Sequence, residues 1–90
     1  MSVEIHIPQF LQHLAGGTRV VNARGNTVGE CLADLVKQYP QLEESLFNKK
    51  GKLLTLLSIY VNGKAAYPDE LAKPVKEGDK LQIMYTLVGG

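Results

Sequence analysis

Apolar and polar residues alternate in three short stretches of the chain, and this period of two is typical of strands with one buried face. The stretches cover residues 3–8, 57–61 and 81–86. The β-branched stretch 18–22 predicts a further strand that pairs back on the first. Asn62 and Gly63 are a strong hairpin signal, so 64–67 predicts a short returning strand. The pattern therefore predicts four or five strands.

One long helix is predicted between the second and third of these strands. Thr27 and Glu30 have the spacing of a capping box, in which each side chain bonds the backbone amide of the other residue. Apolar residues from 28 to 39 recur at intervals of three and four and form one buried stripe, and Pro40 ends the helix. Cys31 lies within this stripe, so we interpret it as a buried thiol rather than a nucleophile.

The remaining segments are shorter. Phe10, with Leu11 and Leu14, is expected in a connecting loop at the edge of the core, and 42–48 and 69–71 are expected to add helical turns. One helix covers only one face of a sheet, which excludes a doubly wound fold. The order strand, strand, helix, strands favours an α+β roll with the helix laid across the sheet by a right-handed crossover.

Composition narrows the class of protein. Ninety residues with 44% hydrophobic content indicate one soluble domain, and the net charge of +1 gives no reason to expect binding to nucleic acid or membrane. No apolar run approaches the roughly 18 residues that span a bilayer. The N-terminus lacks a basic segment followed by an apolar one, and a single cysteine cannot form an internal disulfide. We therefore expect a cytoplasmic protein.

Little in the chain is equipped for catalysis. His6 lies on the polar face of the first strand, but no second histidine or cysteine stands at a metal-binding spacing. Gly16 and Gly17 predict a turn rather than a phosphate cradle, because no Gly-Lys-Ser/Thr pattern follows. No nucleophile–base pair is recognisable. We therefore predict no catalytic residue, no metal site and no bound cofactor.

The end of the sequence carries the clearest candidate chemistry. Gly89 and Gly90 follow the last predicted strand, and residues without a Cβ leave the backbone unusually free. We expect a folded domain over 1–86 and a flexible tail over 87–90, in which Leu87, Val88 and Gly89 carry the α-carboxylate of Gly90. The alternative interpretation is an ordinary frayed terminus.

A docking surface is predicted beside this tail. Met84 and Tyr60 lie on the strand faces opposite Ile83 and Ile59, so they form an exposed apolar patch if their strands are neighbours. Such patches are typical of partner-binding surfaces, and we include the adjacent Tyr85 among the partner-binding residues. Ordinary surface apolarity is the alternative.

The two terminal glycines, the helix beginning at Thr27 and the I-Y-V-N-G stretch at 59–63 together resemble the ubiquitin-like sulfur-carrier (ThiS/MoaD-like) family. The resemblance runs from V-E-I-H-I-P at 3–8 to G-D-K-L-Q-I at 78–83. It implies a β-grasp fold, with a mixed sheet of four to five strands, one main helix on one face, and the first and last strands as parallel neighbours in the middle. The chain departs from the family at Tyr85 and Thr86, where members often have prolines.

The resemblance implies a carrier that acts as a co-substrate and is not itself an enzyme. A ubiquitin-activating-type enzyme adenylates Gly90 with ATP, and a sulfur donor displaces AMP to leave a thiocarboxylate. An apolar residue at the position of Met84 is what the family uses against its enzymes. A monomer is expected when the protein is free.

Several acceptors remain open. The G-G at 16 and 17 and the I-Y-V-N stretch most resemble the cysteine-biosynthetic members, whose acceptor is a cysteine-synthase-like enzyme and whose product is released by a metalloprotease. The small subunit of molybdopterin synthase, which works with a large subunit, and a thiamin-type carrier are alternatives. From another class, a ubiquitin-like modifier that forms isopeptides and a binding module with an irrelevant tail also remain open.

Overall fold

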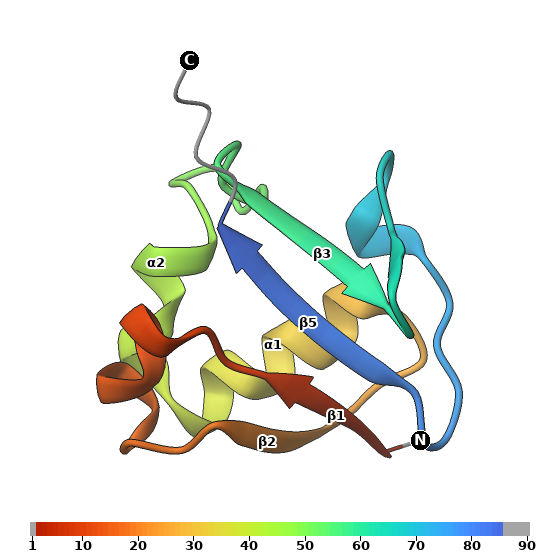
Figure 1. The fold of residues 1–90 in the computed structure, drawn as a ribbon. Coiled ribbons are helices and arrows are strands. Elements are labelled where there is room, and N and C mark those ends of the chain that lie inside the picture. The colour runs from red at the N-terminus through yellow and green to blue at the C-terminus, as the bar shows by residue number, and fades with distance from the viewer. Residues whose placement is uncertain (1, 86–90) are drawn as a thin grey trace.

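The computed structural model describes residues 2–85, which form a five-stranded mixed sheet with helices packed against it (Figure 1). The strands are β1 Ser2–His6, β2 Val20–Arg24, β3 Leu57–Val61, β4 Lys64–Ala65 and β5 Lys80–Tyr85. They lie in the order β2-β1-β5-β3-β4. The predicted α+β class and strand number are confirmed.

The first and last strands are parallel neighbours in the middle of the sheet. Ile5 of β1 lies opposite Leu81 of β5, whereas β3 runs antiparallel to β5 with Ile59 opposite Ile83. These four side chains are almost completely buried, as the alternating pattern predicts. Burial of an aliphatic side chain of this size contributes roughly 1.5–3 kcal/mol to folding, so the two central strands anchor the core. The expected β-grasp arrangement is therefore confirmed.

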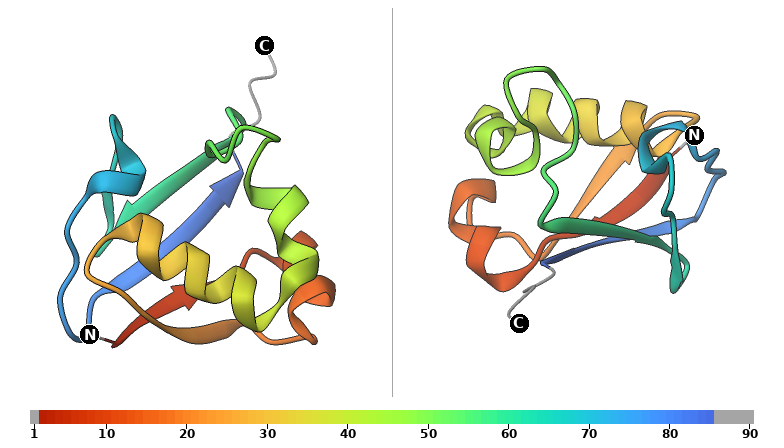
Figure 2. Two further views of the ribbon diagram at one scale, coloured as in Figure 1. Left: turned by 180° about the vertical axis from the view of Figure 1, so that it is seen from behind. Right: turned by 90° about the horizontal axis from the view of Figure 1, so that it is seen from above.

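Helix α1, Val28–Gln38, lies across one face of the sheet (Figure 2). Its buried side chains, Val28, Cys31, Leu32 and Leu35, are those of the predicted apolar stripe. Cys31 is fully buried, and this burial raises the pKa of its thiol above 9.0, with the charges of Asp34 and Glu30 adding to the effect. The thiolate is thus disfavoured, which agrees with a structural role for Cys31.

The start of α1 is capped, although the predicted reciprocal pair is correct in only one direction. The Thr27 Oγ1 accepts a hydrogen bond from the Glu30 amide at 3.1 Å, but the Glu30 Oε1 accepts from the amide of Asn26, at 2.7 Å, rather than from that of Thr27. The backbone at Gly25 explains the difference. A Cβ there would stand 2.8 Å from the Cys31 nitrogen, so the chain passes tightly against the first turn and presents Asn26 to Glu30.

Some assignments predicted from local pattern are wrong. The first strand, predicted over 3–8, ends at His6. The segment expected as a loop around Phe10 is a 3-10 helix, η1 Gln9–Ala15, whose buried Leu11 and Ala15 are four positions apart. The second strand covers Val20–Arg24 rather than 18–22, because pairing with β1 places Val21 opposite Ile5 and buries both. The returning strand β4 has only two residues rather than the four expected over 64–67.

The remaining turns follow their local signals. Asn62 and Gly63 have positive φ angles of 51° and 84°, as their hairpin requires. The helical turn predicted over 42–48 is present as η2 Pro40–Leu42 and α2 Glu43–Leu46, and that predicted over 69–71 is η3 Glu70–Ala72. Within residues 2–85, none of the helices combines the length and the apolar character needed to cross a membrane.

Candidate functional site

Strand β5 lies in the centre of the sheet and precedes the C-terminal residues that are predicted to be functional. It pairs with β1 on one side and with β3 on the other, and its last residue, Tyr85, lies opposite Leu57. The predicted tail residues, Leu87, Val88, Gly89 and Gly90, and the predicted boundary after residue 86 lie outside the described residues. The described chain therefore ends in the second half of β5, which pairs with β3 up to Tyr85, whereas its pairing with β1 ends at Gln82.

The beginning of β5 is held by a buried carboxylate. Asp79 accepts hydrogen bonds from the Asn62 side-chain amide at 3.0 Å and from the Lys76 backbone amide at 2.9 Å. The Asn62 Oδ1 in turn accepts from the Lys80 backbone amide at 2.9 Å. These hydrogen bonds, that from Asn62 first, lower the pKa of Asp79 below its ordinary value of 3.8. The β3–β4 hairpin and the start of β5 are thus joined, which fixes the register of the terminal strand.

The structure brings Met84 and Tyr60 to the same outer face of the sheet, the face opposite α1. Met84 lies opposite Ser58 and Tyr60 opposite Gln82, so the two apolar side chains are diagonal neighbours on adjacent strands. Met84 is 46% exposed and Tyr60 is half-buried. The predicted juxtaposition is confirmed, whereas its role in binding a partner stays a prediction.

Tyr85 does not join this outer patch. Because side chains alternate along a strand, Tyr85 points to the face opposite Met84, where its ring meets that of Phe10 from η1. The two ring centroids are 4.6 Å apart at an interplanar angle of 69°, an edge-to-face contact at the point where the described chain ends. Sequence reasoning missed Phe10 in this role, since nothing in its local pattern pairs it with a residue 75 positions away.

The outer face also carries His6 and Glu4 of β1. The Nε2 of His6 lies 3.3 Å from the Glu4 Oε1, and both side chains are partly exposed. Among residues 2–85, no group of three histidine, cysteine or acidic side chains is arranged to hold a metal ion. What this face offers is an apolar contact surface with a polar margin, next to the end of the sheet's central strand.

Comparison with known proteins agrees with this architecture. The ThiS family model matches residues 5–90. The sulfur carrier protein CysO of Mycobacterium tuberculosis is 33% identical over 93 residues, and the alignment covers 100% of both chains. Among solved structures, the Amycolatopsis orientalis BexX/CysO complex has a chain that superposes with a TM-score of 0.87 at 31% identity, over 98% of this chain and 99% of that one. SAMP1 of Haloferax volcanii superposes with a TM-score of 0.86 at 31% identity over 100% of both chains.

Proposed function

Because the chain belongs to the ThiS family, we propose that it is a sulfur carrier whose Gly90 carboxyl group is the site of loading. One observation carries the proposal. The ThiS family model matches the chain through Gly89 and Gly90. In the sequence these glycines follow Tyr85, the last residue of the central strand, by four and five positions. The folded body is thus a handle, and the glycines offer a backbone without side chains to a narrow activating site.

The chemistry follows from the low reactivity of a carboxylate, whose negative charge repels nucleophiles. In the proposed cycle, a Gly90 carboxylate oxygen attacks the α-phosphorus of ATP in a ubiquitin-activating-type enzyme, and pyrophosphate leaves. A sulfide-level donor then attacks the acyl carbon, and AMP leaves with the electrons of the C–O bond. The product is an ionised thiocarboxylate that is a soft nucleophile. The carrier is a co-substrate throughout, and ATP is bound by its partner rather than by this chain.

The relatives named CysO support cysteine biosynthesis as the destination of the sulfur. In this pathway the thiocarboxylate sulfur displaces the leaving group of an activated serine on a cysteine-synthase-like enzyme. An S-to-N acyl shift then links the new cysteine to Gly90 through an amide bond, which a metalloprotease hydrolyses. A molybdopterin synthase large subunit or a thiamin-type acceptor would use the same loaded end, so the acceptor enzyme decides the pathway.

Intact-mass spectrometry tests the loading step. The full chain is incubated with ATP, an activating enzyme and a sulfide source, and the expected result is replacement of one oxygen by sulfur, located at Gly90 by fragmentation. A variant lacking Gly90 is the control and should keep its mass. An unchanged mass of the full chain, with an enzyme shown to load another carrier, would overturn the proposal.

A second candidate function is protein modification, which the similarity to SAMP1 supports. The small archaeal modifier protein 1 of Haloferax volcanii is 34% identical over 82 residues, covering 89% of this chain. The same adenylated Gly90 would then react with a lysine amine to form an isopeptide. Cell extracts should show a ladder of conjugates that disappears on deletion of Gly90. If the thiocarboxylate forms and no ladder of conjugates appears, only the carrier function is supported.

A further inference from the structure

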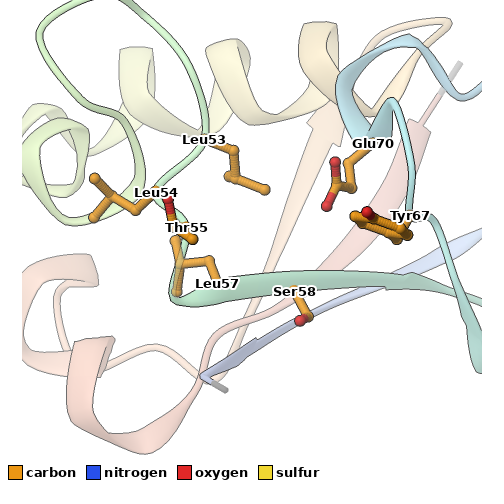
Figure 3. A pocket seen from close by; sticks show the side chains of 7 residues that line it. All are labelled: Leu53, Leu54, Thr55, Leu57, Ser58, Tyr67 and Glu70. Carbon is orange, nitrogen blue, oxygen red and sulfur yellow. The ribbon is translucent and has the colours of Figure 1, made fainter. Parts of the chain in front are cut away.

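A groove between the segment before and at the start of β3 and the segment after β4 is unexplained by the proposed function. A hollow of about 380 Å³ separates residues 53–58 from the segment that leads into η3 (Figure 3). Leucines form one wall, and Tyr67 and Glu70 form the other. An adjoining hollow of about 400 Å³ shares Leu53 and Glu70 and extends to Asp69. We call the two together the acidic groove; its lining residues are Lys52, Leu53, Leu54, Thr55, Leu57, Ser58, Tyr67, Asp69, Glu70, Leu71 and Ala72.

The groove exists because β4 is short. This strand pairs only with Tyr60 and Val61, so the beginning of β3 at Leu57 has no β4 residue opposite it. The chain after β4 instead runs through Tyr67 to η3. A space remains between this segment and Leu57, and no side chain of residues 2–85 fills it. The opening therefore lies beside the first residues of β3, where β4 does not pair with it.

Both walls are anchored to the body of the protein. The Leu54 amide donates to the Leu46 carbonyl at 2.9 Å, which ties the leucine wall to α2. On the other side, a Cβ at Gly29 would stand only 2.9 Å from the Leu71 carbonyl oxygen, so η3 packs directly on α1. The groove is thus preformed, which lowers the entropic cost of binding.

The charge in the groove is unbalanced. Within residues 2–85, the carboxylates of Glu70 and Asp69 have no hydrogen-bond or ion-pair partner, and Lys52 makes no ion pair with either. Glu70 is half-buried beside the apolar side chains that line the groove. Tyr67 is 77% exposed, the highest fraction among the large hydrophobic side chains described. A half-buried carboxylate next to an open aromatic ring is suited to a cation with an apolar stem.

We propose that the acidic groove receives an arginine side chain from a partner protein. The guanidinium bonds the Glu70 carboxylate and stacks on the Tyr67 ring, while the methylene stem covers Leu53. Arginine fits better than lysine, because a planar guanidinium can both stack on a ring and bond a carboxylate through two N–H groups. Acidic partner side chains are repelled by Asp69 and Glu70.

The position of the groove indicates which partner supplies this arginine. Leu57 lines the groove and is also the β3 residue opposite Tyr85, from which the chain continues toward Gly90. A protein that holds the C-terminal residues therefore lies within reach of the groove. The inference rests on the proposed function, to which it adds a contact with the partner protein. Binding of the arginine requires neither ATP nor a loaded Gly90, so an experiment can disprove one proposal without disproving the other.

The test is an NMR titration of the full ¹⁵N-labelled chain with acetyl-Leu-Arg-Leu-amide. The matched probe replaces arginine by citrulline, which keeps the shape and removes the charge. We expect amide shifts centred on Leu53, Tyr67 and Glu70, and affinity about fivefold or more lower for the citrulline peptide, as for the loss of one charged hydrogen bond. Glu70→Gln and Tyr67→Ala should each weaken the arginine peptide similarly, whereas the control Glu44→Gln, an exposed carboxylate outside the groove, should not.

Three results would overturn the inference. The first is shifts centred on the outer face around Met84, and the second is equal affinity of the two peptides. The third is the absence of shifts at about 10 mM arginine peptide, a concentration at which even a contact with a Kd near 1 mM is mostly occupied. The ¹⁵N spectra of the variants report their folding directly, so a misfolded variant is recognised before the titration.

Discussion

At the scale of single residues, Asp79 is buried as a charged group because donors surround it. Its exposed fraction is 6%, and its two oxygens accept from the Asn62 side chain and the Lys76 amide. Hydrogen bonds of this kind favour the ionised form and offset the cost of removing it from water. Local sequence does not reveal the partner of Asp79, since Asn62 is 17 positions away and reaches Asp79 only in the folded chain.

Asp79→Asn should lower stability at neutral pH and lose this effect in acid. The folded pKa of Asp79 lies below its ordinary value of 3.8, so the stabilisation is complete above 3.8 and is lost as the pH falls through the folded pKa. The urea midpoint of the variant should therefore lie below that of the wild type at about pH 6, and the gap should shrink at about pH 3. Glu44→Gln is the control, and an equal gap for Asp79→Asn at both pH values would contradict the assignment.

At the scale of elements, α1 is the part of the fold that sequence describes best. Its apolar stripe, its Thr27 cap and its end before Pro40 are all local signals, because each depends on residues within one or two turns. Strand β2 was misplaced by two residues, since its register depends on Val21 meeting Ile5 of another strand. Helix η1 was missed for a similar reason: its two buried residues become apolar anchors only against the assembled core.

Thr27→Ala should lower the free energy of unfolding by about 1 kcal/mol, because the Glu30 amide loses its side-chain acceptor. Thr27→Ser keeps an oxygen at the same place and should restore most of this loss. Urea denaturation monitored by circular dichroism measures both variants. Equal destabilisation by alanine and serine would show that the threonine methyl group, rather than the cap, stabilises the helix start.

Gly29→Ala separates helix propensity from packing. Alanine is favoured over glycine within a helix by about 1 kcal/mol, but its Cβ would stand 2.9 Å from the Leu71 carbonyl oxygen and 3.2 Å from the Leu71 Cβ. Overpacking of this kind costs about 1–3 kcal/mol, so we expect a net loss of about 1 kcal/mol. Lys37→Ala, at an exposed position of the same helix, should change stability by less than about 0.5 kcal/mol. If Gly29→Ala were more stable than the wild type, η3 would have to lie further from α1 than it does in the structure.

At the scale of the whole molecule, long-range pairing is what sequence pattern could not supply. Periodicity identified the strands around Ile5 and Leu81, but their parallel pairing came from family resemblance and is confirmed by the structure. In the candidate site, period two correctly placed Met84 and Tyr60 on one outer face. The contact of Tyr85 with Phe10 and the acidic groove lay beyond prediction, because each joins segments that only the tertiary fold brings together.

The outer face makes a whole-molecule prediction, since it includes Met84 of β5, the strand that precedes Gly90, the proposed site of loading. Met84→Ser removes an apolar side chain that is 46% exposed, so stability should change by less than about 0.5 kcal/mol. If the partner covers Met84, KM for adenylation should rise about tenfold while kcat stays constant, because the lost contact affects docking and not the reacting carboxylate.

Lys37→Ala is the control for Met84→Ser, since Lys37 is exposed and lies on α1, on the face of the sheet opposite Met84. Its KM should stay within about twofold of the wild type, a change of under 1 kcal/mol in binding. Pyrophosphate exchange catalysed by the activating enzyme gives KM and kcat for all three proteins. Equal KM values for the two variants would mean that the enzyme docks elsewhere. A fall in kcat alone for Met84→Ser would mean that Met84 helps to position the C-terminal residues for the reaction. A contact that only holds the folded domain on the enzyme is already made in the bound ground state, so its loss would not lower kcat.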